Sequence, residues 1–292
     1  MNAARPGELK QELFRTEIEL GGKRVVHDYG AWPKQAQFHA TRARFVVYGG
    51  ARGPGKTVAL VEHILYLMLR WPGIPGLFLR KDLKDLKLTG LREILARWPK
   101  ELYDTKFGGQ YHKGESWFRF PNESFCQLGE LKDWESYKSG TFGFIAIDEL
   151  SEVERDAWVN LNPTLRWTTG KGVCKRPECA ALGEQFAWEH AEHPFYQIFA
   201  ATNPSPGWVK SEFYDPWKAG REKPNHAFVS ATAFDNPSLP PDFIPNLLAN
   251  NTATWVQNYV YGNWEAFEHM VWPRFNRGTH VWRGPLPEFV RV

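Results

Sequence analysis

One octapeptide constrains this chain more than any other segment, and it consists of Gly50, Ala51, Arg52, Gly53, Pro54, Gly55, Lys56 and Thr57. It matches the pattern G-x-x-x-x-G-K-[ST] at every fixed position. Glycines let the backbone curl until successive N–H groups face one anion, and the helix that follows directs the positive end of its dipole at the same anion. In this pattern Lys56 contacts the β- and γ-phosphates of a nucleotide and the Thr57 hydroxyl binds Mg²⁺.

The segments on either side of the loop support this interpretation. Residues 44–48 have the short, β-branched and aromatic character of a buried strand, and two glycines end it. From Lys56 to Arg70 apolar residues recur at helical spacing, and Trp71-Pro72-Gly73 ends the predicted helix. The alternative is a glycine-rich turn with a chance lysine, which the agreement of strand, loop and helix disfavours.

A second apolar strand, 144–147, ends in two carboxylates, Asp148 and Glu149. At a strand end beside the phosphate loop, Asp148 can hold Mg²⁺, and Glu149 can orient and deprotonate an attacking water. The adjacent glutamate favours hydrolysis over a small-molecule kinase or a GTP switch. Without the loop upstream, the same pattern would indicate only a strand that meets solvent.

A third apolar strand, 195–201, is followed by Thr202-Asn203-Pro204. Neutral side chains such as Thr202 and Asn203 can sense the γ-phosphate or hold the lytic water through hydrogen bonds. Alone, this stretch would more readily indicate a strand followed by an Asn-Pro turn. The two preceding motifs reverse that preference.

Helices and apolar strands alternate along most of the chain. A further strand is predicted at 76–79, a helix at 82–98, and a hairpin at 116–128 around Pro121-Asn122-Glu123. The alternation predicts an α/β fold with a mostly parallel central sheet flanked by helices. We expect residues 1–30 to form a poorly packed N-terminal leader, 31–235 the nucleotide-binding domain, and 236–292 a short C-terminal linker subdomain.

The composition excludes several classes of protein. The longest apolar run, 64–69, is six residues long, far below the roughly 20 that span a bilayer. We expect no secretory signal in the first thirty residues and, with three cysteines in 292 residues, no disulfide framework. The net charge of +3 is not that of a polycation, so any contact with nucleic acid would need a local basic surface.

The ordered series of motifs resembles the ATPase domain of the large terminase subunit of tailed bacteriophages, the motor that packages DNA into the capsid. The stretches that carry the resemblance are Trp32-Pro-Lys-Gln35-Ala-Gln-Phe38, the phosphate loop with Arg52, Leu79-Arg80, the hairpin at 118–124, Asp148-Glu149, Thr202-Asn203-Pro204, Asp235-Asn236-Pro237 and Tyr261-Gly262-x-Trp264. They cover roughly residues 30–275. The loop alone is specific; beyond it, the specificity lies in the order of the stretches.

The resemblance implies a P-loop NTPase fold of the ASCE type and an ATPase that uses ATP and Mg²⁺. It implies that Gln35 holds the adenine, with Trp32 or Phe38 as its apolar wall. It places Arg52 over the γ-phosphate as a sensor or in-cis finger. It also makes Glu149 the catalytic base and Thr202 and Asn203 the coupling motif that links hydrolysis to movement.

The resemblance also implies partners. Motors of this family move double-stranded DNA, work with a portal protein and a small terminase subunit, and assemble as a ring, usually a pentamer. The implied location is the portal vertex of the procapsid in the host bacterial cytoplasm, without a membrane. A basic residue donated in trans would complete each site, and Lys138 is our candidate. The alternative for Lys138 is an ordinary solvated loop lysine.

Large terminase subunits normally continue into an RNase H-like nuclease with several carboxylates around two metals. After Asp242 this chain has no aspartate, and Glu265, Glu268 and Glu288 are its only acidic residues. These cannot assemble a two-metal site. We therefore expect no DNA cleavage by this chain, whose C-terminal linker would lead toward a nuclease domain that it does not contain.

Two further patterns leave alternatives open. Four possible zinc ligands, Cys174, Cys179, His190 and His193, are spaced at the loose end of structural zinc sites, and unpaired thiols with surface histidines are the alternative. Residues 80–106 carry eight basic and five acidic residues. This run is either a face for DNA or a neighbouring subunit, or the solvated side of a helix.

Two other functions compete with the packaging motor. One is another P-loop DNA motor, a helicase or a RecA-like ATPase, although a common helicase would need a second RecA-like domain for which the chain has no room. The other is a nucleotide-binding docking module with little turnover as an isolated chain. The presence of Lys56, Asp148 and Glu149 disfavours an inactive site but not a slow one.

Overall fold

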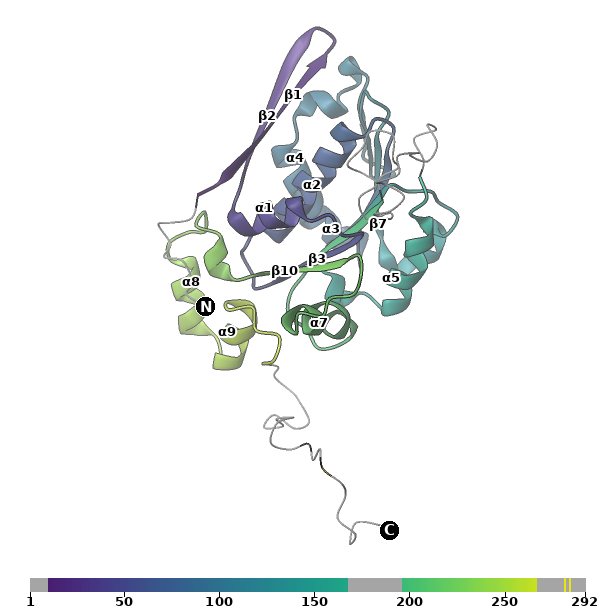
Figure 1. Ribbon diagram of the computed structural model, residues 1–292. Coiled ribbons are helices and arrows are strands. Elements are labelled where there is room, and N and C mark those ends of the chain that lie inside the picture. The colour runs from purple at the N-terminus through teal and green to yellow at the C-terminus, as the bar shows by residue number, and fades with distance from the viewer. Residues whose placement is uncertain (1–9, 168–195, 267–280, 282–283, 285–292) are drawn as a thin grey trace, which may run out of the picture.

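The computed structural model describes residues 10–167, 196–266, 281 and 284. An eight-stranded sheet forms its centre (Figure 1). In spatial order the strands are β10 (His226–Ala231), β3 (Phe45–Gly50), β9 (Gln197–Thr202), β8 (Phe144–Ile147), β4 (Pro75–Arg80), β7 (Phe125–Glu130), β6 (Trp117–Arg119) and β5 (Gln110–His112). The first six strands are parallel, and β6 and β5 continue the sheet antiparallel. The mostly parallel sheet and the hairpin predicted at 116–128 are therefore confirmed.

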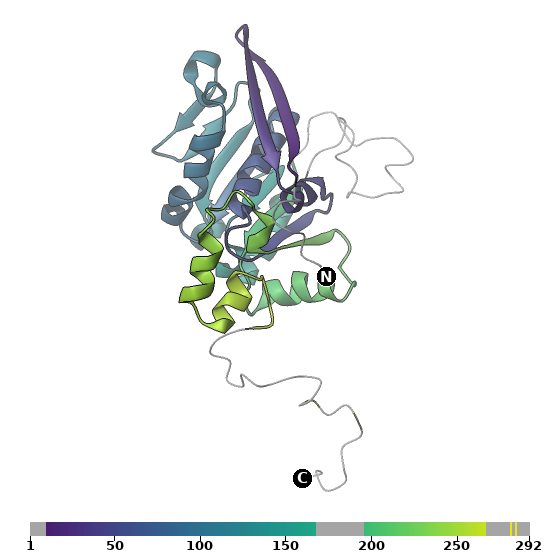
Figure 2. The ribbon, with the colours of Figure 1, turned by 90° about the vertical axis from the view of Figure 1, so that its left-hand side faces the viewer.

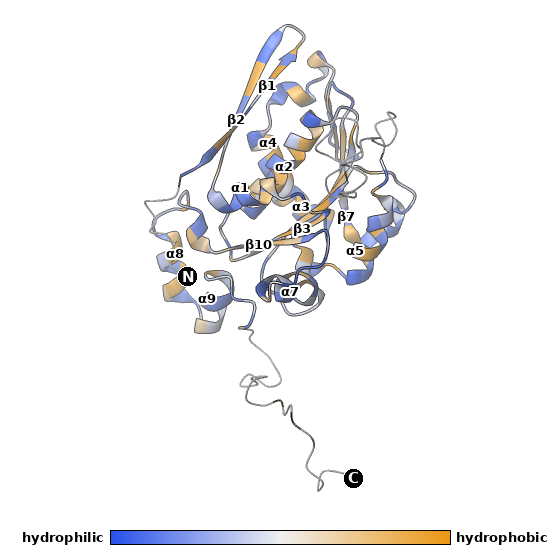
Figure 3. Cartoon of the chain, in the orientation of Figure 1, coloured by the Kyte–Doolittle hydropathy of each residue, from blue (hydrophilic) through white to orange (hydrophobic). Residues whose placement is uncertain are grey.

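Helices cover both faces of the sheet, as the sequence predicts. On one face lie α1 (Pro33–Ala40), α2 (Lys56–Arg70) and α4 (Gly90–Arg97), and on the other lie α5 (Arg155–Leu161) and a π-helical turn, Lys210–Tyr214, that runs into α7 (Asp215–Lys218). The strands alternate between the two cores: in β8, Phe144 and Ala146 face α2, whereas Ile145 and Ile147 face α5. Apolar residues accordingly gather in the central strands (Figure 3).

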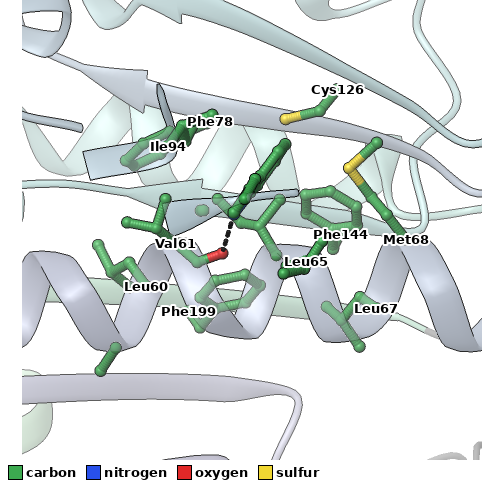
Figure 4. Close-up of a cluster of buried hydrophobic side chains, with 14 of the residues drawn as sticks. Leu60, Val61, Leu65, Leu67, Met68, Phe78, Ile94, Cys126, Phe144 and Phe199 are labelled. Atoms are coloured by element: carbon green, nitrogen blue, oxygen red, sulfur yellow. Dashed lines mark hydrogen bonds between the residues drawn. The ribbon is translucent and has the colours of Figure 1, made fainter. Parts of the chain in front are cut away.

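Helix α2 is the main support of the phosphate loop, and the structure confirms its predicted bounds. Its inner side packs Leu60, Val61 and Leu65 against strand residues such as Phe144 (Figure 4). The Val61 carbonyl accepts a hydrogen bond of 3.2 Å from the indole N–H of Trp98, drawn dashed in Figure 4. Because ten of the fifteen residues of α2 are buried, the loop at its N-terminus rests on a rigid base.

The strand order decides which side chains meet. Strand β9 lies between the loop strand β3 and the acidic strand β8, and all three are parallel. Their carboxyl ends therefore meet at one edge of the sheet, where ligands bind in open α/β sheets. This edge carries the phosphate loop, Asp148-Glu149 and Thr202-Asn203.

The expectation of a poorly packed leader at 1–30 is wrong for residues 12–30, which belong to the hairpin of β1 (Glu12–Leu20) and β2 (Lys23–Ala31). Its turn lies at one end of the molecule and α8 and α9 lie at the other (Figures 1 and 2). Leu20 and Val25 join the core, and Nε2 of His27 lies 2.8 Å from a carboxylate oxygen of Glu62 on α2. In β1 charged residues largely alternate with apolar ones. The average composition of the segment is therefore polar, although the two-residue periodicity of its hydrophobic side chains is that of a strand.

The single helix predicted at 82–98 is also wrong. The structure has two helices, α3 (Leu83–Leu88) and α4, separated at Thr89, whose φ and ψ are −113° and −83°. Gly90 follows the break, and a Cβ there would collide with the ring of Phe78. Close packing on β4 and the low helix propensity of glycine explain why the helix is interrupted here.

Two helices, α8 (Phe243–Asn250) and α9 (Ala253–Tyr259), follow β10 in the chain. Val256 and Val260 form a small apolar cluster with Ala51 of the phosphate loop and with Ala233. Downstream, Trp264 is fully buried against Tyr214 and Phe228. The described residues between 236 and 260 thus pack against the phosphate loop.

The four predicted zinc ligands, Cys174, Cys179, His190 and His193, lie outside the described residues. Within the described ranges, no helix combines the length and the apolar character that a membrane crossing requires.

Candidate functional site

The phosphate loop has the backbone that its glycines predict. Gly50 has a φ of 142°, and a Cβ at this position would collide with the carbonyl oxygen of Ala231 on the adjacent strand. Gly55 adopts the left-handed conformation directly before α2. A side chain at either position would distort the loop. The N-terminus of α2 therefore opens on the loop, as an anion site requires.

Lys56 is buried and its ammonium group is enclosed by oxygen atoms. Nζ donates to the carbonyl oxygens of Gly50, at 3.2 Å, and Ala51, and to Oδ1 of Asn203 at 3.0 Å. Burial lowers the pKa of Lys56 to about 8, against the opposing charges of Glu149 and Asp148. The lysine is thus held at the edge of the sheet with its charge only partly compensated.

Thr57 and Asp148 come together as the sequence predicts. The Thr57 hydroxyl donates to Oδ1 of Asp148 at 3.3 Å, and burial, followed by the charge of Glu149, raises the pKa of Asp148 to about 6. No group of three or more His, Cys, Asp or Glu able to hold a metal ion occurs among the described residues. A hydroxyl and one carboxylate nevertheless fit Mg²⁺, which prefers oxygen ligands and takes the rest of its shell from phosphates and water.

Two hydrogen bonds join Glu149 and Asn203. Nδ2 of Asn203 donates to both carboxylate oxygens of Glu149, each at 2.8 Å. The backbone of Glu149 is left-handed, with φ of 54°, which is uncommon for a residue other than glycine. Thr202, directly before Asn203, accepts a hydrogen bond of 3.1 Å from the backbone N–H of Ser151. The pair fixes the direction of the Glu149 carboxylate.

Gln35 lies against the loop, but the protein already uses both ends of its amide. Oε1 accepts from the backbone N–H of Trp32 at 2.9 Å, and Nε2 donates to the carbonyl oxygen of Gly55 at 3.0 Å. Contact of Gln35 or Trp32 with adenine stays a prediction. Phe38 is fully buried and stacks on Tyr48, whereas Trp32 is partly exposed, which favours Trp32 over Phe38 as the apolar wall of the adenine.

The two other predicted cations point elsewhere. The Arg52 guanidinium lies over the rings of Tyr259, at 4.8 Å, and Trp255, at 5.7 Å, both on α9. Lys138 pairs with Glu135 at 2.8 Å, and its Nζ lies 4.3 Å from the ring centroid of Trp134. Their roles as sensor and trans donor stay predictions.

Three residues of the site had no role assigned from the sequence. Asn236 donates to the carbonyl oxygen of Gly53 at 2.7 Å, and only the Asp-Asn-Pro pattern pointed to it. Arg80, at the end of β4, lies 3.8 Å from Oδ2 of Asp148. The Thr89 hydroxyl lies 3.3 Å from the same oxygen, and no sequence signal indicated it.

No protein-family model matches this chain, and no curated protein matches it. Among solved structures it is similar to the large terminase from a thermophilic bacteriophage, with a TM-score of 0.60, 14% identity, and coverage of 80% of this chain and 53% of that chain. A structure of the same phage terminase in complex with ATP-γ-S gives a TM-score of 0.58 and 15% identity, over 87% of this chain and 58% of that one.

The large terminase ATPase domain of Thermus phage P74-26 gives a TM-score of 0.53 at 12% identity, over 78% of this chain and 91% of that one. The match to the first of these terminases thus spans only 53% of its length. At such low identities the likeness concerns the fold, and it confirms the fold that the resemblance in the sequence implies. The chain therefore has the P-loop NTPase fold seen in the ATPase domains of large terminases.

Proposed function

We propose that this chain is the ATP-hydrolysing motor domain of a machine that drives double-stranded viral DNA into a procapsid. One observation carries the proposal: the phosphate loop, the Thr57–Asp148 pair and the Glu149–Asn203 pair converge at the same edge of the sheet. The neighbours of the same fold, one of them in complex with ATP-γ-S, support it.

The arrangement supports the following chemistry. The N–H groups of the loop and Lys56 bind the β- and γ-phosphates, and Thr57 with Asp148 would hold Mg²⁺, which neutralises charge on the phosphates. Glu149, oriented by Asn203, accepts a proton from water as the water oxygen bonds to the γ-phosphorus and the bond to the ADP oxygen breaks. The products are ADP and inorganic phosphate.

Steady-state release of phosphate from ATP tests the hydrolysis, with Glu149→Gln as the control. We expect wild-type turnover well above that of Glu149→Gln, because removal of a general base typically costs about 10²- to 10⁴-fold. Equal rates in the two proteins would refute the catalytic role. A rate per subunit that rises with protein concentration would support a ring in which one subunit completes the site of the next.

The remaining proposals rest on the likeness to terminases. They are a homo-oligomeric ring, a portal protein, a small terminase subunit, and action at the portal vertex in the host bacterial cytoplasm. Linear double-stranded DNA added to the ATPase assay tests the substrate of movement. We expect duplex DNA to raise the ATP hydrolysis rate of the wild type but not that of Glu149→Gln. A hydrolysis rate that duplex DNA leaves unchanged at every protein concentration would count against a DNA motor.

One observation favours the alternative of a docking module with little turnover as an isolated chain. Arg52 stacks on Tyr259 and Trp255, and Lys138 is paired with Glu135, so neither predicted cation is directed at the phosphates in the single chain. Tight ATP binding with no phosphate release above the Glu149→Gln control, even at high protein concentration, would favour this alternative.

A further inference from the structure

The two carboxylate oxygens of Asp148 have different partners. Oδ1 faces Thr57, whose hydroxyl lies 3.3 Å away, on the side of the phosphate loop. Oδ2 faces away from the loop, toward the hydroxyl of Thr89 at 3.3 Å and Nη1 of Arg80 at 3.8 Å. Oδ1 is thus placed where it can bind a metal, whereas Oδ2 interacts with side chains of the protein.

Arg80 and Thr89 act on Oδ2 together. Nη1 of Arg80 donates to the Thr89 hydroxyl oxygen at 3.4 Å, so the hydroxyl hydrogen is turned away from the guanidinium. Two acceptors lie within its reach: the carbonyl oxygen of Asp85, at 3.0 Å, and Oδ2 of Asp148. The ionised carboxylate is the stronger acceptor, because hydrogen bonds to charged groups are roughly twice as strong as neutral ones.

The two residues bracket α3. Arg80 is the last residue of β4, before the helix, and Thr89 is the break that ends it. The irregular backbone at Thr89 places a hydroxyl over Asp148 that a continuous helix would carry elsewhere. The Arg80 side chain is largely buried, with 15% of it exposed, which limits the positions that its guanidinium can take.

We propose that Thr89 and Arg80 are positioning residues that fix the Asp148 carboxylate with Oδ1 toward the metal position beside Thr57. This inference rests on the proposed function, since it assigns residues that serve the same nucleotide site. Removal of a residue that orients a metal ligand typically lowers the metal affinity by about 10- to 100-fold. Both residues act on the carboxylate from the side opposite the phosphate loop.

The test measures binding of ATP-γ-S by calorimetry, with Mg²⁺ titrated from zero in the full chain. Thr89→Val removes the hydroxyl and nearly keeps the shape, whereas Thr89→Ser keeps the hydroxyl. We expect Thr89→Val to raise the Mg²⁺ concentration at half-saturation by about 10- to 100-fold and to leave Mg²⁺-free binding unchanged. Thr89→Ser should stay within about threefold of wild type in both measurements.

The chain offers a matched control in Thr41. Like Thr89, Thr41 ends a helix, and its hydroxyl lies within hydrogen-bond distance of the carbonyl oxygen four residues earlier. In Thr41 the hydroxyl donates to that carbonyl, of Gln37, at 2.8 Å on the exposed side of α1. Thr41→Val should leave the Mg²⁺ dependence unchanged. If it raised the Mg²⁺ requirement as Thr89→Val does, the effect would belong to helix ends in general and the proposal would be wrong.

Arg80→Gln and Arg80→Lys give an independent route should Thr89→Val fold poorly. Arg80→Gln should also raise the Mg²⁺ requirement, and adding Thr89→Val should add little, because the two residues serve one oxygen. The positioning role is overturned, while the nucleotide site stands, if Thr89→Val and Arg80→Gln leave the Mg²⁺ dependence unchanged. It is also overturned if these variants weaken ATP-γ-S binding equally with and without Mg²⁺. A wild-type chain that binds no ATP-γ-S at any Mg²⁺ concentration overturns the proposed function as well.

Discussion

Replacement of Asn203 by alanine is the most direct test of how the site orients its base. The side chain donates to both oxygens of Glu149 at 2.8 Å and accepts from Lys56 at 3.0 Å. A hydrogen bond to a charged group contributes about 1.5–3 kcal/mol. Since each 1.36 kcal/mol is a factor of ten in rate, Asn203→Ala should lower kcat by roughly 10- to 160-fold.

The assay is steady-state ATP hydrolysis with kcat and KM measured separately. We expect KM to change by less than about threefold, because orientation of the base matters in the transition state more than in substrate binding. Asn160→Ala, which removes an amide-to-carbonyl hydrogen bond on the exposed side of α5, is the matched control and should leave both constants unchanged.

A double mutant separates orientation of Glu149 from other effects. If Asn203 acts through Glu149, Asn203→Ala should cost little further activity in the Glu149→Gln background. A kcat of Asn203→Ala within twofold of wild type would refute the reasoning. So would an equal loss of activity in the Glu149→Gln background.

Three further predictions concern binding and stability. Phosphates beside Lys56 should raise its pKa from about 8, so ATP binding should take up protons near pH 8.5 and should weaken as the pH rises further. Calorimetry in two buffers with different ionisation enthalpies measures the proton uptake, and uptake that persists in Lys56→Met would contradict this account. Trp264→Ala, which empties a fully buried position, should lower the free energy of unfolding by about 3–5 kcal/mol in chemical denaturation, and a loss below 1 kcal/mol would count against its core role. Gly55→Ala should weaken ATP binding by roughly tenfold or more, because alanine is strained at a φ of 79° and its Cβ meets the Gln35 amide; wild-type affinity would exclude this account.

The parts of the fold that could be predicted depend on local patterns. The strand, loop and helix around Lys56 follow from residues close together in the chain, and so does the acidic strand 144–147. The hairpin of β1 and β2 was missed because charged residues mask its alternation, although Gly21-Gly22 is a turn signal. The helix break at Thr89 was missed because packing of Gly90 on Phe78 decides it, and no periodicity reports such a contact.

The sequence by itself singled out the residues that we propose bind phosphate, hold a metal and activate water, because these roles belong to side-chain types at fixed local spacing. Only the tertiary structure decided how they are combined. Asn203 meets Lys56 across 147 residues and Thr89 meets Asp148 across 59, because β9 enters the sheet between β3 and β8, and because α3 ends over the acidic strand. Strand order and helix breaks depend on packing between distant segments, and this is why the partners of each carboxylate could not be predicted from the chain alone.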